Sequence, residues 1–79
     1  MNKEELIKKV NEVLAEEFEK EVKELTPEKN IKQTLELDSL SLVDMVALIE
    51  NEFGVKIPSG DLIKVQTFAQ LYDYLAERI

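Results

Sequence analysis

The sequence contains no cysteine and no histidine. Without cysteine the chain forms neither a disulfide nor a thiolate metal site, and without histidine it lacks the commonest metal ligand and the usual general base near neutral pH. Hydrolytic triads and most zinc chemistry are therefore excluded, and we expect no catalytic residue and no metal site. No apolar run approaches the length that spans a bilayer.

Positive charge is absent from one long segment. The 79 residues carry a net charge of −7, and residues 33–55 contain five acids without a single Lys or Arg. Such acidity repels the phosphates of nucleic acids and anionic membranes, whereas it suits basic protein surfaces. The polar N-terminus, with Glu4 and Glu5, is not typical of a signal peptide. We therefore expect a cytoplasmic protein whose partners are proteins, with neither nucleic acid nor a membrane among them.

Apolar residues recur at helical spacing in three segments, and the length suits a single domain over residues 1–79. The predicted fold is an all-α bundle of three main helices and one short helix. The first main helix is expected from about Lys3 to about Glu21, and Thr26-Pro27-Glu28 then opens a long connection with a short helical turn. Further along, Ser59 is expected to cap the short helix, residues 61–64, and a Thr67–Gln70 capping box starts the last helix, residues 68–79.

The second main helix, residues 40–53, is the most apolar of the three. Asp38 or Ser39 is positioned to cap its start, and Gly54 suits a left-handed cap at its end. Its apolar residues cover more than one stripe, which predicts that the helix is buried on most sides and exposes only its polar positions. In the short helix, Leu62 and Ile63 are expected to point inward.

Ser39 is the candidate functional residue because of where it stands. Taken alone, a serine at this position is most simply a helix cap. A helix N-terminus also offers free N–H groups and a partial positive charge, so a phosphate bonded to Ser39 would be well placed. The uncharged residues 40–43 leave apolar surface beside the hydroxyl, and Asp38 and Asp44 lie near the same end. A phosphodiester there would emerge beside apolar side chains and within a ring of carboxylates.

Three motifs in this region resemble those of acyl carrier proteins: Leu37-Asp38-Ser39-Leu40, then Val43-Asp44, then the segment Glu50-Asn51-Glu52-Phe53-Gly54-Val55-Lys56-Ile57-Pro58. The resemblance covers nearly the whole chain. It implies a stand-alone carrier that is not an enzyme. A Mg²⁺-dependent phosphopantetheinyl transferase would attach 4′-phosphopantetheine from coenzyme A to Ser39. The thiol of that arm would then carry acyl groups as thioesters between enzymes of fatty-acid, related lipid or polyketide synthesis.

The resemblance also assigns roles to other residues. It implies that partners with basic docking surfaces, namely acyl-transferring and chain-elongating enzymes, recognise a monomeric carrier at Asp38, Leu40, Asp44 and Glu50. The residues implied to border a pocket for the acyl chain are Val43, Val46, Ala47 and Leu62.

Some positions depart from the family pattern, and other functions stay open. Glu36 stands where the family usually has glycine, which implies a stiffer approach to Ser39. Ser41 and Asn51 stand where many bacterial fatty-acid carriers have acids, which weakens the electrostatic pattern. A D-alanyl or peptidyl carrier would share the same fold. From a different class, an unmodified acidic adaptor would bind basic partners through the second helix without using Ser39.

Overall fold

The computed structural model describes residues 2–79, and within them the fold is entirely helical. No strand forms in this range, where one isolated antiparallel bridge joins Asn30 to Thr67. The predicted all-α bundle of three main helices is confirmed, with two short α-helices and a 3-10 helix in addition. In chain order the helices are α1 (Lys3–Glu17), η1 (Val22–Glu24), α2 (Ile31–Leu35), α3 (Ser39–Phe53), α4 (Ser59–Leu62) and α5 (Phe68–Arg78).

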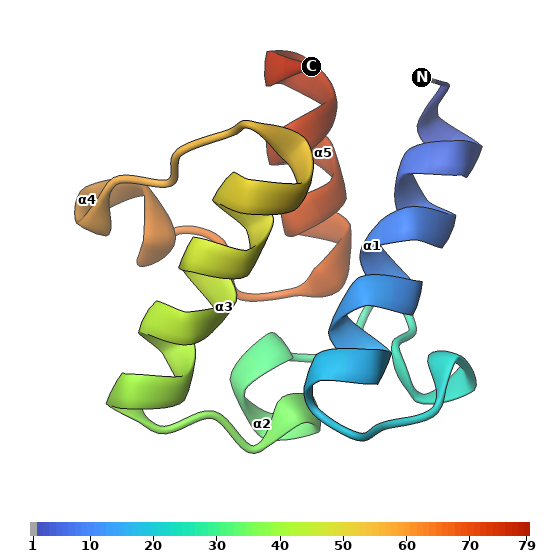
Figure 1. Ribbon diagram of the computed structural model, residues 1–79, viewed down its shortest axis with the longest axis vertical. Helices are drawn as coiled ribbons and strands as arrows, with labels where there is room; N and C mark the ends of the chain where they lie inside the picture. The colour runs from blue at the N-terminus through green and yellow to red at the C-terminus, as the bar shows by residue number, and fades with distance from the viewer. Residues whose placement is uncertain (1) are drawn as a thin grey trace.

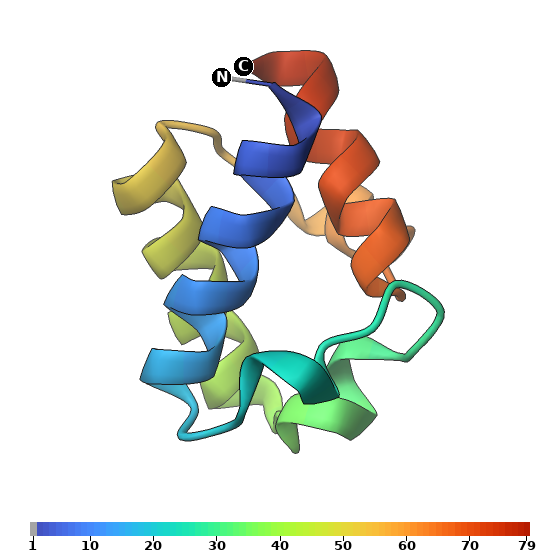
Figure 2. The same ribbon diagram turned by 90° about the vertical axis from the view of Figure 1, so that its right-hand side faces the viewer.

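The three long helices form the body of the bundle (Figure 1). α1 runs in the opposite direction to α3 and α5, so α1 begins at the end of the molecule where α5 finishes (Figure 2). α2 lies at the other end, where α3 begins, and α4 lies on the outer side of α3. Both short helices therefore lie beside α3, the helix that starts with Ser39.

The first helix is shorter than its sequence predicts. α1 ends at Glu17, and Glu19 adopts a left-handed conformation with φ of 56°. That turn directs the backbone N–H of Lys20 to the carbonyl of Ala15, at 2.8 Å, which closes the helix end. The prediction of helix to about Glu21 was wrong because glutamate is a good helix former and gives no signal of a left-handed cap.

The connection from α1 to α3 contains helices that the sequence pattern did not reveal. Residues 22–24 form the separate helix η1 rather than a continuation of α1. The turn expected at Pro27 is present. In this turn the backbone N–H of Lys29 donates a hydrogen bond to the carbonyl of Thr26 at 3.1 Å. α2 follows after Asn30, whose side chain caps it by accepting from the N–H of Gln33 at 3.0 Å. A five-residue helix is too short to show a clear apolar period.

Both caps of α3 are confirmed, but its burial is not as predicted. Asp38 is the N-cap, and Gly54 ends the helix with φ of 70°. Only Met45 and Ile49 are fully buried on α3, whereas Leu40 is 77% exposed. The prediction that this helix is buried on most sides was wrong, because no other helix within residues 2–79 covers the side of α3 that carries Leu40 and Val43.

The region after α3 matches its prediction in outline. Residues 55–58 form no helix, and Pro58 among them is extended, as expected for a linker. α4 begins at Ser59, two residues earlier than predicted, and Pro58 is its N-cap. The prediction that the Ser59 side chain caps this helix was wrong, because the helix has no side-chain cap. Ile63 was expected to point inward and is instead 72% exposed. The Thr67–Gln70 capping box at the start of α5 is confirmed, because the side chain of each residue accepts a hydrogen bond from the backbone N–H of the other.

The hydrophobic core lies where α1, α3 and α5 meet, closed at one end by α2. Tyr72 is buried there, with its hydroxyl bonded to the side-chain oxygen of Asn11, and burial raises the pKa of that tyrosine. No helix within residues 2–79 combines the length and the apolar character needed to cross a membrane. The largest side chains of the core are Tyr72, Phe68, Leu14, Ile31, Met45, Ile49, Leu71, Leu75 and Val10.

Candidate functional site

Ser39 is the first residue of α3 and lies exposed at the end of the bundle nearest α2 (Figure 1). Within residues 2–79, no hydrogen bond occupies its hydroxyl, and its side chain is exposed, whereas Ser41 is half-buried. The first-turn N–H groups of a helix have no partner within the helix and favour a negative group beside them. Ser39 therefore offers a free nucleophilic oxygen at a position suited to a phosphate.

Asp38 fixes the start of the helix that carries Ser39. Its carboxylate accepts a hydrogen bond from the backbone N–H of Ser41 at 2.8 Å. This bond, assisted by the Ser41 hydroxyl, holds the pKa of Asp38 below the ordinary value of 3.8. The carboxylate thus stays charged at neutral pH and defines the residue at which α3 begins, which places Ser39 immediately after the cap.

The capping role of Asp38 predicts a pH-dependent stability. Asp38→Ala is expected to melt at a lower temperature than the original protein at neutral pH, because the N–H of Ser41 loses its acceptor. Since the folded pKa is depressed, the stabilisation is complete above the unfolded value of 3.8 and is lost as pH falls through the folded value. Melting curves recorded against pH should therefore show the difference between the two proteins shrinking in acid.

Asp38→Asn is the matched control for this effect. The amide oxygen of asparagine still accepts from Ser41, so this variant should melt close to the original protein at neutral pH. Its advantage over Asp38→Ala should not change with acid, because an amide does not titrate. An equal loss of stability in both variants would mean that the charge of Asp38, and not the cap, sets the start of α3.

Glu36, two residues before Asp38, ends α2 in a left-handed conformation with φ of 55° and ψ of 47°. Glycine is the residue best suited to that conformation, so the glutamate here is strained. Its carboxylate pairs with Lys20 at 2.8 Å, a hydrogen bond that lowers the pKa of Glu36 and raises that of Lys20. The ion pair joins the approach to Ser39 to the segment just after α1.

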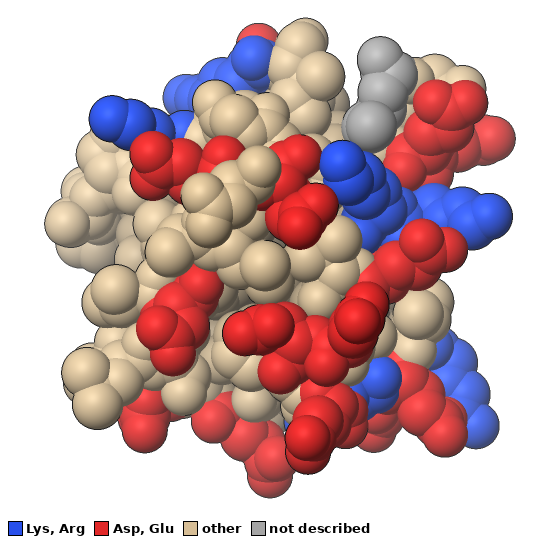
Figure 3. All heavy atoms as spheres, in the orientation of Figure 1, with Lys and Arg blue, Asp and Glu red and all other residues tan. Residues whose placement is uncertain are grey.

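The exposed face of α3 combines acids with apolar side chains. Figure 3 shows acidic side chains over this helix and over the end of the bundle where it begins, with Lys and Arg mostly toward the edges of the view. By helical periodicity the exposed residues of the helix body share one side, and Ser39 lies at the edge of that side. The exposed members, which we call the α3 face, are Leu40, Val43, Asp44, Ala47, Glu50 and Asn51.

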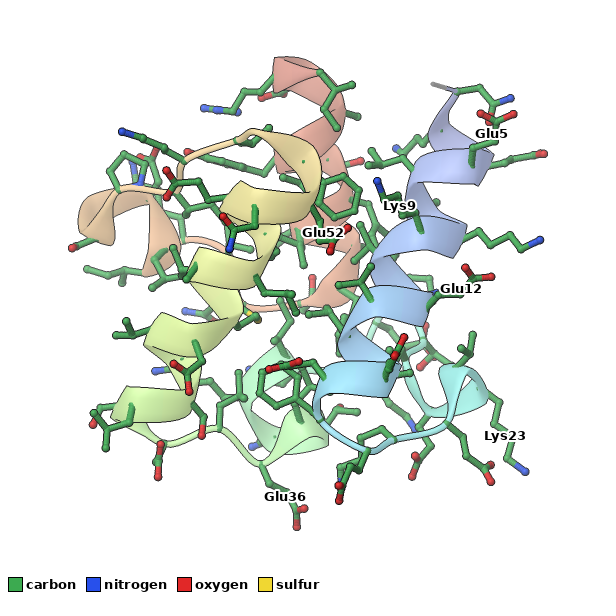
Figure 4. All side chains as sticks on the ribbon, viewed as in Figure 1. Glu5, Lys9, Glu12, Lys23, Glu36 and Glu52 are labelled. Carbon is green, nitrogen blue, oxygen red and sulfur yellow. The ribbon has the colours of Figure 1, made fainter. Side chains whose placement is uncertain are left out.

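A base from α1 lies at the C-terminal end of α3. α3 has no basic residue in its last turn, where a cation would stabilise the helix dipole. Lys9 supplies one: its ammonium group donates to the carbonyl of Glu52 at 3.2 Å and lies 5.0 Å from the ring centroid of Phe53. Figure 4 shows Lys9 on α1 reaching toward the end of α3, while Glu36 lies at the opposite end.

A cavity of about 390 Å³ lies between α2, α3 and α4. Leu42, three residues after Ser39 and hence its neighbour on the helix surface, is part of the wall. Of the four residues predicted to border an acyl pocket, Leu62 lines this cavity. Val43 and Ala47 belong instead to the α3 face, and Val46 packs against the core. The lining residues are Asn30, Ile31, Lys32, Leu42, Met45, Ser59, Leu62, Ile63, Val65 and Gln66.

Most of these wall residues were not predicted from the sequence. Leu42 and Met45 belong to an apolar run in which every position looks alike, and Ile31 lies on a short helix without a clear period. The side of α3 that faces the cavity depends on where α4 crosses, which no local pattern specifies. The rotation of α3 within the bundle was therefore the missing information.

Comparison with known proteins gives a consistent picture. A family model described as a phosphopantetheine attachment site matches residues 8–75. The acyl carrier protein of Rubrobacter xylanophilus is 35% identical over 77 residues, which cover 98% of this chain and 95% of that protein. The acyl carrier protein of Thermotoga maritima is 33% identical, with 99% and 96% of the two chains covered.

Other relatives extend this similarity. The meromycolate extension acyl carrier protein of Mycobacterium leprae is 36% identical over 75 residues, which cover 95% of this chain and 65% of that protein. A solved structure of the acyl carrier protein from Enterococcus faecalis superposes with a TM-score of 0.81 at 33% identity, covering all of both chains. Sequence and structure therefore point to the same class of protein.

Proposed function

Because this chain belongs to the acyl carrier protein family, we propose that the Ser39 hydroxyl is where its 4′-phosphopantetheine is attached. Members of the family carry acyl groups and are not enzymes themselves. When attached, the arm supplies the thiol that this chain lacks and holds the acyl group as a thioester. The observation that carries the assignment is the exposed, unengaged hydroxyl of Ser39 at the first position of α3.

The residues around Ser39 fit a phosphodiester. The free N–H groups of the first turn and the partial positive charge of the helix end favour its negative charge. The carboxylate of Asp38 accepts a hydrogen bond from the N–H of Ser41, and that bond fixes the direction in which the helix leaves the cap. During attachment the Ser39 oxygen gives up its proton and bonds to the phosphorus, while the adenosine bisphosphate part of coenzyme A leaves. The protein's part is to present that oxygen on a rigid helix.

The experiment is attachment followed by mapping. The protein is incubated with coenzyme A, Mg²⁺ and a promiscuous phosphopantetheinyl transferase, and its intact mass should rise by one arm. Proteolytic fragments should carry the increment on the peptide that contains Ser39. Ser41→Ala serves as the control and should be modified like the original protein. Either an unchanged mass or an increment on another peptide would contradict the assignment.

As a family member, the chain interacts with a phosphopantetheinyl transferase and with enzymes of acyl metabolism. The finer part of the proposal is that Asp38, Leu40, Asp44 and Glu50 form the surface that these enzymes recognise. All four are exposed, and three lie on the α3 face. A basic partner would be steered by the carboxylates and would cover the apolar side chain of Leu40. Modification by the transferase should slow as salt is added, and less steeply for Asp44→Asn.

We also propose that the cavity between α2, α3 and α4 shelters the acyl chain. Its lining includes the apolar side chains of Leu42, Met45 and Leu62, and Leu42 lies one helical turn from Ser39. Of the pocket residues named from the sequence, only Leu62 belongs to this site, so Val43, Val46 and Ala47 are given no part in it. The apolar side chains that α2, α3 and α4 each contribute to this cavity favour an acyl cargo over a D-alanyl or peptidyl one. Fatty-acid or related lipid synthesis is the setting that we infer.

A further inference from the structure

Of the helices that line the cavity, α4 is the least stable by itself. The cavity has α3 on one side, through Leu42 and Met45. Its other side includes α4, through Ser59 and Leu62, and Ile63 just after that helix. A helix of four residues is far too short to be stable alone, and α4 has no side-chain cap. Its position relative to α3 is therefore set by contacts with other helices.

One hydrogen bond ties α4 to α5. The hydroxyl of Tyr74 donates to the carboxylate of Asp61 at 2.7 Å, and both side chains are part-buried. Across residues 2–79, no other side-chain hydrogen bond links α4 to a different helix. Asp61 is on the part of α4 that faces α5, whereas Leu62 lines the cavity. The bond therefore joins α4, on its side away from the cavity, to α5.

Tyr74 is itself held in place. The guanidinium of Arg78 stacks on its ring, 3.5 Å from the centroid, and donates to the backbone carbonyl of Tyr74 at 3.1 Å. On the same helix Leu71 and Leu75 are completely buried, which anchors α5 in the core. The hydroxyl of Tyr74 is thus a fixed point on the rigid part of the bundle, and α4 is the element that can move relative to it.

We propose that Tyr74 is a positioning residue that, through Asp61, limits how far α4 moves away from α3 and so sets the length of acyl chain that the cavity accepts. This inference rests on the proposed role of the cavity as the shelter of the cargo. A longer chain needs more volume, and the cavity enlarges when its α4 wall moves outward. The Tyr74–Asp61 bond opposes that movement, so its removal should shift the preference toward longer chains.

Tyr74→Phe isolates this bond, because it removes the hydroxyl and keeps the ring on which Arg78 stacks. The chain offers a matched control in Tyr72→Phe. Tyr72 lies on the same helix, and its hydroxyl bonds to Asn11 instead of α4. Both variants lose one oxygen from α5, so a difference between them reports on the tie to α4 alone.

The first measurement uses the unmodified protein. Amide hydrogen exchange is followed at Leu62 and Ile63, whose N–H groups bond to the carbonyls of Pro58 and Ser59 within α4. Exchange there should be about tenfold faster in Tyr74→Phe than in the original protein, the scale expected when a hydrogen bond to a charged group is lost. Tyr72→Phe should leave these amides unchanged. Equal exchange at Leu62 and Ile63 in all three proteins would overturn the tie.

The second measurement uses the loaded proteins. Each is loaded at Ser39 with saturated acyl chains of increasing length, and the rise in melting temperature over the unloaded form is recorded. The chain that gives the largest rise should be longer for Tyr74→Phe than for the original protein and Tyr72→Phe. The same optimum in all three would overturn the inference, as would no rise with any chain in proteins that load normally. A failure to load at all would count against the proposed function, and the exchange measurement would still decide whether Tyr74 holds α4.

Discussion

Ser39→Ala is expected to abolish attachment of the phosphopantetheine arm completely and to leave the fold intact. The reaction needs the serine oxygen as its nucleophile, and no neighbouring side chain supplies one at the same place. Ser41 is half-buried within the first turn of α3, and Ser59 starts a helix of only four residues. Intact mass after incubation with coenzyme A, Mg²⁺ and the transferase should show no increment for this variant.

The fold should tolerate this change because Ser39 is exposed and its hydroxyl makes no hydrogen bond within the described chain. Alanine is a strong helix former, and Asp38 still caps α3. The free energy of unfolding should stay within about 0.5 kcal/mol of the original value, as for other surface positions. Circular dichroism and a melting curve provide this control. A well-folded Ser39→Ala protein that still gains one arm would disprove the assignment.

Leu71→Ala is expected to destabilise the protein severely. Leu71 is completely buried on α5 between the other long helices. Truncating a buried leucine costs about 2–5 kcal/mol, from lost apolar burial and from the cavity left behind. A 79-residue domain is stable by roughly 4–12 kcal/mol in total, so this one change removes a large part of the margin. Denaturant unfolding should show a much lower midpoint with a similar slope.

Leu40→Ala is the matched control, since it makes the same chemical change at a side chain that is 77% exposed. Its free energy of unfolding should change by at most about 0.5 kcal/mol. The same variant should nevertheless weaken complexes with partner enzymes, because Leu40 lies on the α3 face. Equal destabilisation by the two substitutions would mean that α3 is packed more deeply than its exposed fraction indicates. An unchanged partner affinity would remove Leu40 from the docking surface.

Several features were predictable because short stretches of sequence specify them. A cap residue before α3, Gly54 after it and the Thr67–Gln70 box before α5 are each fixed by hydrogen bonds within a few residues. The same holds for Ser39, whose chemical setting depends on the start of one helix. The resemblance to the family also marked Glu36 as a departure from glycine, and the structure places it in the conformation that glycine suits best. Local rules apply at these positions because the partners are neighbours in the chain.

Other features were beyond local rules. Glu19 ends α1 in a conformation that glutamate disfavours, and the ion pair that Lys20 then forms joins residues 16 positions apart. The exposure of Leu40 and Ile63 likewise follows from which helices are present to cover them. In a chain of this size there are not enough elements to bury every apolar residue. Hydrophobicity alone therefore overestimated the burial of α3.

By itself, the sequence predicted a small helical bundle and excluded most hydrolytic and zinc chemistry, and its resemblance to acyl carrier proteins implied that Ser39 presents the arm. Its lack of cysteine and histidine was sufficient for that exclusion, whereas the role of Ser39 depended on the family motifs within residues 37–58. Only the tertiary structure decided which side of α3 faces the cavity, and that Tyr74 reaches Asp61 from another helix. The physical reason is that the rotation and spacing of packed helices depend on contacts between segments that are distant in the sequence. Helix caps and runs of like charge depend only on residues that are neighbours in the chain.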